Sequence, residues 1–209
     1  MKVAKYIIAV VAILVVGYNS VYFRKLDAVK ASLTAKEFNA AQYAQTFWTS
    51  KLRPNLNKAI DIARLTALLR TDADKTFTTY SHALGIGNLR YFLVKGKGTI
   101  ISVNDDDISV LLRPDTSRQT ILLATEYIFG NAVRDATGLI NINEFNNTME
   151  FNNVSAELNK IIRQKVLPSL KQKAKKGNEI EFTGAIELNK EHLDLSRIEV
   201  VPVEVMSNE

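Results

Sequence analysis

Apolar residues recur at helical spacing in the first part of the chain after residue 35. They return about every third or fourth position from Phe38 to Trp48 and again from Ala59 to Leu69. Pro54 separates these two runs and is expected to break the helix. A third helix is predicted to begin near Asp72, a favourable N-cap residue, and to end by the glycines at 85 and 87. Residues 31–85 are therefore predicted to form a small helical region.

After Gly87 the apolar pattern changes to a period of two, which is typical of strands. Three strands are predicted at residues 91–103, 108–112 and 120–129, with turns at 104–107 and 114–117. Gly96 and Gly98 lie inside the first strand and indicate a bulge or bend. A long helix is predicted over residues 154–176, with a kink at Pro168. Two more strands are predicted at residues 179–188 and 193–205.

Three strands, a helix and two strands follow each other in the order of an OB-fold, a five-stranded Greek-key barrel. The segment from Gly177 to Gly184 resembles the entry to the fourth strand of small OB domains. We therefore predict an α+β protein with an OB-fold-like five-stranded barrel and a long helix between strands 3 and 4. An unspecified α+β domain is the alternative. The expected organisation is a membrane-anchor helix at residues 1–25, a helical region at 26–87 and the OB-like β-barrel domain at 88–209.

The N-terminal segment has the pattern of a membrane-targeting sequence. Lys2 and Lys5 precede an apolar run from Tyr6 to Tyr18, and Arg24 and Lys25 follow it. Extended to residues 3–23, the run would form a helix about 31 Å long, enough to cross the bilayer core. No cleavage pattern with small residues follows, so we favour an uncleaved signal anchor; a cleaved signal peptide and a buried core helix are the alternatives. A single N-terminal span in the inner (plasma) membrane would place the C-terminal domain in the periplasm.

Composition narrows the chemistry that the chain can carry. The 209 residues include no cysteine, which excludes disulfides and thiolate metal sites. His82 and His192 are the only histidines and lie in different predicted elements, so no histidine pair is indicated. The sequence has no P-loop, G-x-S-x-G or G-x-G-x-x-G motif. We therefore expect no metal and no cofactor. Nucleic-acid binding is not expected either, because basic residues are not interleaved with exposed aromatic ones.

The loop between the third strand and the long helix, residues 130–153, is unusually long for a compact domain. Its apolar residues should hold it against the barrel, and its polar groups then need partners. A polar network is therefore predicted among Asn131, Arg134 and Asp135 of this loop and Asn159 of the helix. One interpretation is structural: a buried Arg134–Asp135 pair that holds the shape of the loop. The other is functional: Arg134 binds the carboxylate or hydroxyl groups of a small polar ligand.

The same loop resembles a bacterial family of predicted periplasmic lipoproteins, domain of unknown function 2291. The matching residues are Gly130-Asn131-Ala132-x-Arg134-Asp135-Ala136-x-Gly138-x-Ile140, Phe145-x-Asn147, Phe151-Asn152, Ser155, Leu158-Asn159, Phe47-Trp48 and Gly96-Lys97-Gly98. Family members typically carry a lipobox cysteine, which this chain lacks, so the anchor helix would take the place of a lipid. The family has no established activity. Its genes often lie beside sugar-type ABC transporter genes, which implies an envelope role near solute uptake.

These observations predict a membrane-anchored extracytoplasmic accessory protein that is not an enzyme. It would assist a sugar-type ABC transporter or bind a small polar ligand, so its partners would be the membrane, transporter components and that ligand. The usual binding face of an OB-fold would involve the turns at residues 104–107 and 189–192. The alternative function is an envelope carbohydrate-active enzyme that uses Asp135 and Glu144 as paired carboxylates. Such a pair would have to face one open cleft, about 5–10 Å apart.

Overall fold

The computed structural model describes residues 6, 10, 11, 13, 15–18, 38–113 and 119–208. The chain divides into two compact units, Met1–Phe38 and Asn39–Glu209. The described residues between 6 and 18 are helical. Within the described part of the chain, no helix has both the length and the apolar character needed to span a membrane. Most of the expected anchor, residues 3–23, lies outside the described residues.

The second unit begins with a continuous run of helical turns. The α-helix α3 (Ala40–Phe47) continues through the π-helical turn η1 (Trp48–Leu52) into the 3-10 helix η2 (Arg53–Lys58). The prediction that Pro54 breaks this run was wrong. Pro54 lies at the start of η2, directly after the π-helical turn, so the helical hydrogen-bond pattern changes there and the run does not end. The chain instead leaves the helix at Ala59, whose ψ angle is 133°.

Two short helices follow, α4 (Ile62–Thr71) and α5 (Ala73–Tyr80), and both are capped by aspartate. The side chain of Asp61 accepts a hydrogen bond from the backbone N–H of Arg64, and Asp72 accepts one from Lys75. These bonds satisfy backbone donors that have no partner inside the helix. The predicted N-cap at Asp72 is confirmed.

Five strands form a closed ring: β2 (Leu89–Val103), β3 (Asp107–Arg113), β4 (Thr120–Ala124), β5 (Glu179–Asn189) and β6 (Ile198–Asn208). Their order is β2-β3-β4-β6-β5, and pairing of β2 with β5 closes the ring. Strands β4 and β6 are parallel, while the other neighbours in the ring are antiparallel. This is the barrel arrangement expected of an OB-fold.

Within the described residues the sheet has six strands, one more than predicted. The additional strand is β1 (Ile60–Asp61), which pairs in parallel with Val94 and Lys95 of β2. The predicted third strand was too long, because β4 ends at Ala124. The predicted turn at residues 114–117 lies outside the described residues.

Gly96 and Gly98 do not form the expected bulge. Pairing between β2 and β5 is continuous from Leu89 to Thr99, and the irregularity in β2 lies between Ile100 and Ser102. Both glycines instead permit close packing. A Cβ atom on Gly96 would lie 2.6 Å from the ring of Phe182, and one on Gly98 would clash with the carbonyl oxygen of Leu111. At Gly98 only a residue without a side chain fits, whereas a larger residue at Gly96 would require the Phe182 ring to move.

The long helix has three parts: α7 (Thr148–Ile161), the π-helical turn η4 (Ile162–Val166) and α8 (Leu167–Lys173). It begins at residue 148 instead of the predicted 154, because the Asn147 side chain accepts a hydrogen bond from the backbone N–H of Glu150 and caps it there. Pro168 lies in the first turn of α8, directly after the π-helical turn. The helix interruption therefore precedes the proline.

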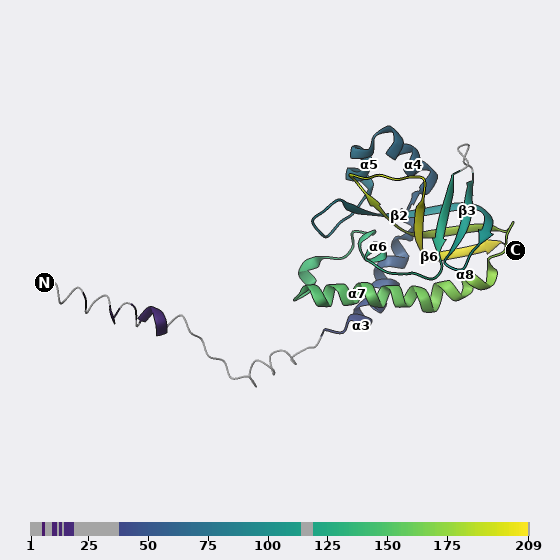
Figure 1. Cartoon of the computed structure of the whole chain (residues 1–209). Coiled ribbons are helices and arrows are strands. Elements are labelled where there is room, and N and C mark those ends of the chain that lie inside the picture. Colours follow the sequence, from purple (N-terminus) through teal and green to yellow (C-terminus); the bar gives the residue numbers. More distant parts are fainter. Residues whose placement is uncertain are drawn as a thin grey trace. The chain divides into compact units, whose positions relative to one another are not determined.

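In Figure 1, α7 and α8 run below the barrel, and α4 and α5 lie above it. Helix α3 packs on α7, and η4 and α8 pack on β6. The helices and the barrel share one core, and residues 87–88 therefore mark a change of secondary structure inside one compact unit. The fully buried large side chains come from both parts: Phe47, Leu52, Ile62, Leu65, Phe92, Ile100, Ile108, Ile121, Leu123, Ile128, Leu158 and Ile162.

Candidate ligand-binding cleft

A one-turn helix, α6 (Ala132–Asp135), places the two charged residues of the long loop inside the protein. Arg134 and Asp135 are only 3% and 2% exposed. The turn follows Gly130, whose φ angle of 74° falls in the left-handed region that glycine adopts most readily. The loop can thus turn inward directly after β4 and the short connection that follows it.

The two buried charges pair with each other in a fork. Nε of Arg134 donates to Oδ1 of Asp135 at 2.6 Å, and Nη2 donates to Oδ2 at 3.0 Å. The remaining nitrogen, Nη1, donates to the carbonyl oxygen of Phe151 at 3.3 Å. The guanidinium also stacks on the ring of Phe151, with Cζ 3.4 Å from the ring centroid. Every guanidinium nitrogen therefore has an acceptor within the protein.

Two further hydrogen bonds connect this loop to helix α7. Ser155 donates from Oγ to Oδ1 of Asn131 at 2.9 Å, and Asn159 donates from Nδ2 to the carbonyl oxygen of Gly130 at 3.0 Å. Asn131, Arg134 and Asp135 line one cleft. Asn159 is bonded to the loop through Gly130 but does not line the cleft. Arg134 and Asp135 are thus buried and paired with each other, and whether this network also binds a ligand stays a prediction.

Tyr91 of β2 lies beside this network and was not indicated by the sequence. Its phenol is held in the neutral form: burial, the charges of Glu187 and Asp135 and a hydrogen bond with Glu187 raise its pKa to about 12. A hydrogen bond with Asn131 acts in the opposite direction. A tyrosine in an alternating strand pattern is indistinguishable from an ordinary core residue, so no signal could have selected it.

The cleft has a volume of about 590 Å³ and lies between residues 83–89, the long loop and the start of α7. Its polar lining is dominated by five side-chain amides, those of Asn88, Asn131, Asn146, Asn147 and Asn152. Its apolar lining comes from Leu84, Ile86, Leu89, Ile142, Phe145 and Phe151. Because the charges of Arg134 and Asp135 cancel, the lining of the cleft carries no net charge. Such a surface suits a neutral ligand with both hydroxyl groups and apolar faces.

Glu144 does not line this cleft. It lies at the end of the 3-10 turn η3 (Ile142–Glu144), where Tyr43 donates a hydrogen bond to its Oε2 at 2.6 Å and Lys51 lies 3.8 Å from its Oε1. Burial and then this hydrogen bond raise the pKa of Tyr43 above its ordinary value. The structure therefore does not bring Asp135 and Glu144 to one open cleft, as paired catalysis would require.

Comparison with known proteins agrees with this architecture. A crystal structure of an OB-fold protein from Thermotoga maritima is similar, with 27% sequence identity and a TM-score of 0.73. The match covers 83% of this chain and 100% of that chain. No curated protein matches the sequence. The family model for predicted periplasmic lipoproteins, DUF2291, matches residues 11–206, so the chain belongs to this family.

Proposed function

We propose that the protein is a membrane-anchored extracytoplasmic accessory protein that binds a small, neutral polar ligand in the cleft beside Arg134. It carries out no catalysis itself and assists a sugar-type ABC transporter. The family description, a predicted periplasmic lipoprotein, supports the location. The ligand and the transporter are the parts of this proposal that need experiment.

The amide lining of the cleft carries the proposal. Among the described residues, the side-chain amides of Asn88 and Asn152 make no hydrogen bond within the protein, and a free amide both donates and accepts, which matches the hydroxyl groups of a sugar-like molecule. Asn88 and Asn152 lie on opposite sides of the cleft, one before β2 and the other in the first turns of α7. Arg134 holds the cleft in shape instead of binding the ligand, because its nitrogens already donate to Asp135 and Phe151.

The same geometry favours binding over catalysis. Both carboxylate oxygens of Asp135 accept hydrogen bonds from Arg134, which leaves this group poorly placed to transfer a proton. Glu144 is bound to Tyr43 outside the cleft lining. A glycosidase needs two carboxyl groups that flank one bond, and this cleft does not offer them.

The proposed anchor rests on the apolar run at residues 6–18 and its flanking lysine and arginine residues. The sequence contains no cysteine to which a lipid could be attached. A helix that stays in the membrane would keep the domain at the surface where the transporter works.

Thermal unfolding with a panel of neutral sugars tests the cleft. D-ribose, D-xylose and D-galactose are suitable probes. A sugar present at about 100 times its dissociation constant stabilises the folded state by about 2.7 kcal/mol. For a domain of this size that corresponds to a rise of roughly 5–10 °C in Tm. Asn152→Ala should abolish the rise while leaving the Tm of the free protein unchanged.

Asn153→Ala is the matched control, because this residue is also exposed on α7 but does not line the cleft. It should retain the full rise in Tm. If none of the sugars shifts Tm, or if both variants respond like the wild type, the cleft does not bind neutral sugars. Capture of the full-length protein from detergent-solubilised membranes, followed by identification of co-purifying transporter subunits, tests the accessory role separately.

A further inference from the structure

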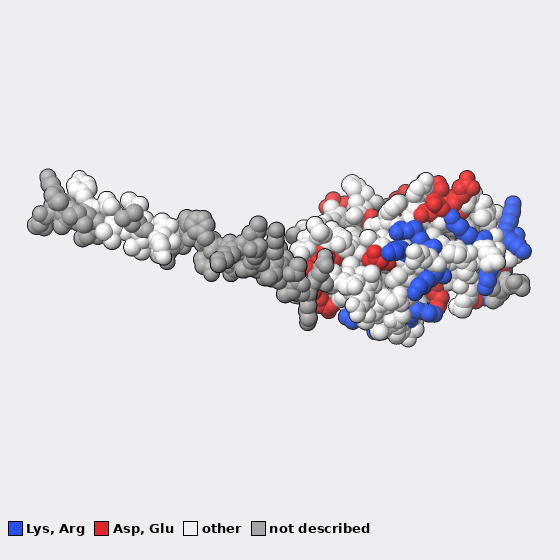
Figure 2. Space-filling view, turned by 90° about the horizontal axis from the view of Figure 1, so that it is seen from below, with Lys and Arg blue, Asp and Glu red and all other residues white. Residues whose placement is uncertain are grey.

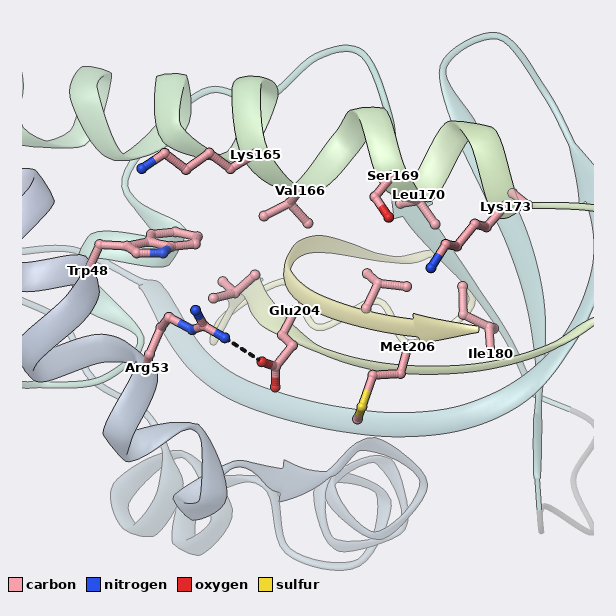
Figure 3. A pocket seen from close by; sticks show the side chains of 13 residues that line it. Trp48, Arg53, Lys165, Val166, Ser169, Leu170, Lys173, Ile180, Glu204 and Met206 are labelled. Carbon is pink, nitrogen blue, oxygen red and sulfur yellow. Dashed lines mark hydrogen bonds and ion pairs between the residues drawn. The ribbon is translucent and has the colours of Figure 1, made fainter. Parts of the chain in front are cut away.

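A second pocket lies at the other end of the long helix and shares no lining residue with the cleft. Its volume is about 310 Å³, and it opens between the helical turns η1 and η2, the end of the long helix, and strands β5 and β6. Figure 3 shows Ser169 and Lys173 pointing into it from α8, Glu204 on the opposite wall, and Arg53 bonded to Glu204 at the end nearer to Trp48. Trp48 closes one end.

The polar half of this pocket is cationic. Three basic side chains, Arg53, Lys165 and Lys173, line it together with a single carboxylate, that of Glu204. Nη2 of Arg53 lies 3.2 Å from Oε1 of Glu204, and Lys165 donates a hydrogen bond to Gln45 at 3.0 Å. Figure 2 shows Lys and Arg side chains across the face that carries the long helix, with Asp and Glu side chains among them. The local field therefore favours a negatively charged ligand.

Ser169 and Lys173 are the groups that can receive such a ligand. Among the described residues, neither the Ser169 hydroxyl nor the Lys173 ammonium has a hydrogen-bond or ion-pair partner. They are four positions apart on one helix and so project from the same face. An acidic group between them would be within reach of a hydroxyl donor and an ammonium.

The floor of the pocket is apolar. Ile180, Val203 and Leu170 are all nearly fully buried, and the ring of Trp48 is only 6% exposed. Water at such a floor gains little from the protein, and an apolar group that replaces it gains hydrophobic free energy. A free inorganic ion would leave this part of the pocket unused.

We propose that this pocket binds a small organic anion: a carboxylate or phosphate that carries a short apolar group. The acidic group lies between Lys173 and Ser169, and the apolar group lies on the floor toward Trp48. Glu204, the one carboxylate of the pocket lining, repels the ligand. This site is independent of the proposed cleft ligand, since the two cavities have no residue in common.

The chain provides its own reporter, because Trp48 is the only tryptophan. Fluorescence excited at a wavelength that only tryptophan absorbs is recorded while hexanoate or hexyl phosphate is added to the full-length protein. Either anion should change the emission in a saturable way. At equal concentration and ionic strength, 1-hexanol and inorganic phosphate should bind more weakly, since each lacks one half of the ligand. The hexanoate and hexyl phosphate titrations together identify the preferred acidic group.

Lys173→Met removes the charge and preserves the length of the side chain, and it should weaken binding of the anion about two- to fivefold, the range of a partly exposed ion pair. Lys171→Met is the matched control on the same helix; its ammonium pairs with Glu126 outside the pocket, and binding should be unchanged. Glu204→Gln should strengthen binding, because it removes the only carboxylate of the pocket lining. A general loss of structure would weaken binding in both variants and so would not produce these opposite effects of Lys173→Met and Glu204→Gln.

The proposal is overturned if neither anion gives a saturable change, or if Lys173→Met and Lys171→Met bind hexanoate equally well. It is also overturned if Glu204→Gln weakens binding while its Tm equals that of the wild type. If no sugar raises Tm, the fluorescence titration with anions is unaffected. Failure of the cleft proposal is therefore distinguishable from failure of this one.

Discussion

Arg134 lies over the ring of Phe151 and also donates a hydrogen bond to the backbone carbonyl of that residue. Phe151 belongs to the first turns of α7, so one side chain from the loop fixes the position at which the long helix starts against the barrel. The Phe151 ring contacts Phe145, which contacts Tyr43 of α3, with both pairs of ring centroids 5.2 Å apart. The buried cation thus sits at one end of a chain of aromatic rings that connects two helices.

Removing this cation should destabilise the whole domain. Arg134→Ala leaves the Asp135 carboxylate buried without a partner, which costs about 3–5 kcal/mol in comparable buried pairs. The free energy of unfolding, measured with urea, should fall by that amount. Asp135→Asn should also be strongly destabilising, because it leaves the guanidinium uncompensated.

Lys97→Met provides the comparison for a surface ion pair. Its ammonium lies 2.8 Å from Glu181, but both side chains are more than 40% exposed. Its loss should leave the urea midpoint nearly unchanged. If Arg134→Ala is as stable as Lys97→Met, the buried pair does not hold the loop, and the functional interpretation of Arg134 gains support.

A methyl group at Gly98 should disrupt the barrel. Its Cβ would clash with the carbonyl oxygen of Leu111 on the neighbouring strand, and a backbone atom in a paired strand has little freedom to move away. Gly98→Ala should therefore lower the free energy of unfolding by about 1–3 kcal/mol or more. Gly85→Ala is the control, because nothing lies within 4 Å of its Cβ position. Equal thermal stability of the two variants would show that β2 and β3 are less closely paired than described.

Tyr91 should make the protein sensitive to alkali. Its pKa is raised to about 12 in the folded state, so between pH 10 and 12 the unfolded chain loses this proton while the folded protein keeps it. The contribution to stability is complete below pH 10 and is lost as the pH rises through 12. Urea unfolding at several pH values in this window measures the free energy of unfolding. This free energy should fall less with rising pH for Tyr91→Phe than for the wild type.

Tyr127→Phe serves as the reference, because Tyr127 is 62% exposed. Its pH profile should follow that of the wild type. If the free energy of unfolding falls as steeply with pH for Tyr91→Phe as for Tyr127→Phe, the fold does not protect the Tyr91 phenol from ionisation.

The proposed anchor predicts membrane association that survives washing. Full-length protein should stay in the membrane fraction after extraction with alkaline carbonate, which removes peripheral proteins but not spanning helices. A variant that begins at Asn39, the first residue of the second compact unit, should appear in the soluble fraction. Release of the full-length protein, with a new N-terminus near Ser20, would instead indicate a cleaved signal peptide.

The barrel could be predicted because its strands carry strong local signals. Asn104 to Asp107 form a polar turn between alternating apolar runs, and the order of elements alone indicated how the ring closes. Asp72 was recognisable as a cap because aspartate before a helical run satisfies free N–H groups. By contrast, β1 has only two residues and presents no periodicity, and it exists only because β2 offers an edge beside it.

The sites were less predictable, because they are assembled from distant segments. Arg134 and Asp135 are adjacent in sequence, and a charged pair in a loop held to the barrel by apolar residues predicted a buried bond as one of two interpretations. The opposite wall of the cleft, residues 83–89, gave no such signal, and neither did Tyr91. Pro54 was misinterpreted for a related reason: the cost of proline depends on whether its N–H would have had a partner, which only the helix boundaries determine.

The parallel pairing of β4 with β6 also determines when the barrel can form. Residues 121–123 of β4 pair with residues 198–200 of β6, which follow much later in the sequence. Before β6 has paired, both β4 and β5 expose an edge that no other strand of the barrel can cover. A chain without a docked β6 therefore cannot close its sheet, and the two open edges can bind chaperones or aggregate until β6 pairs with them.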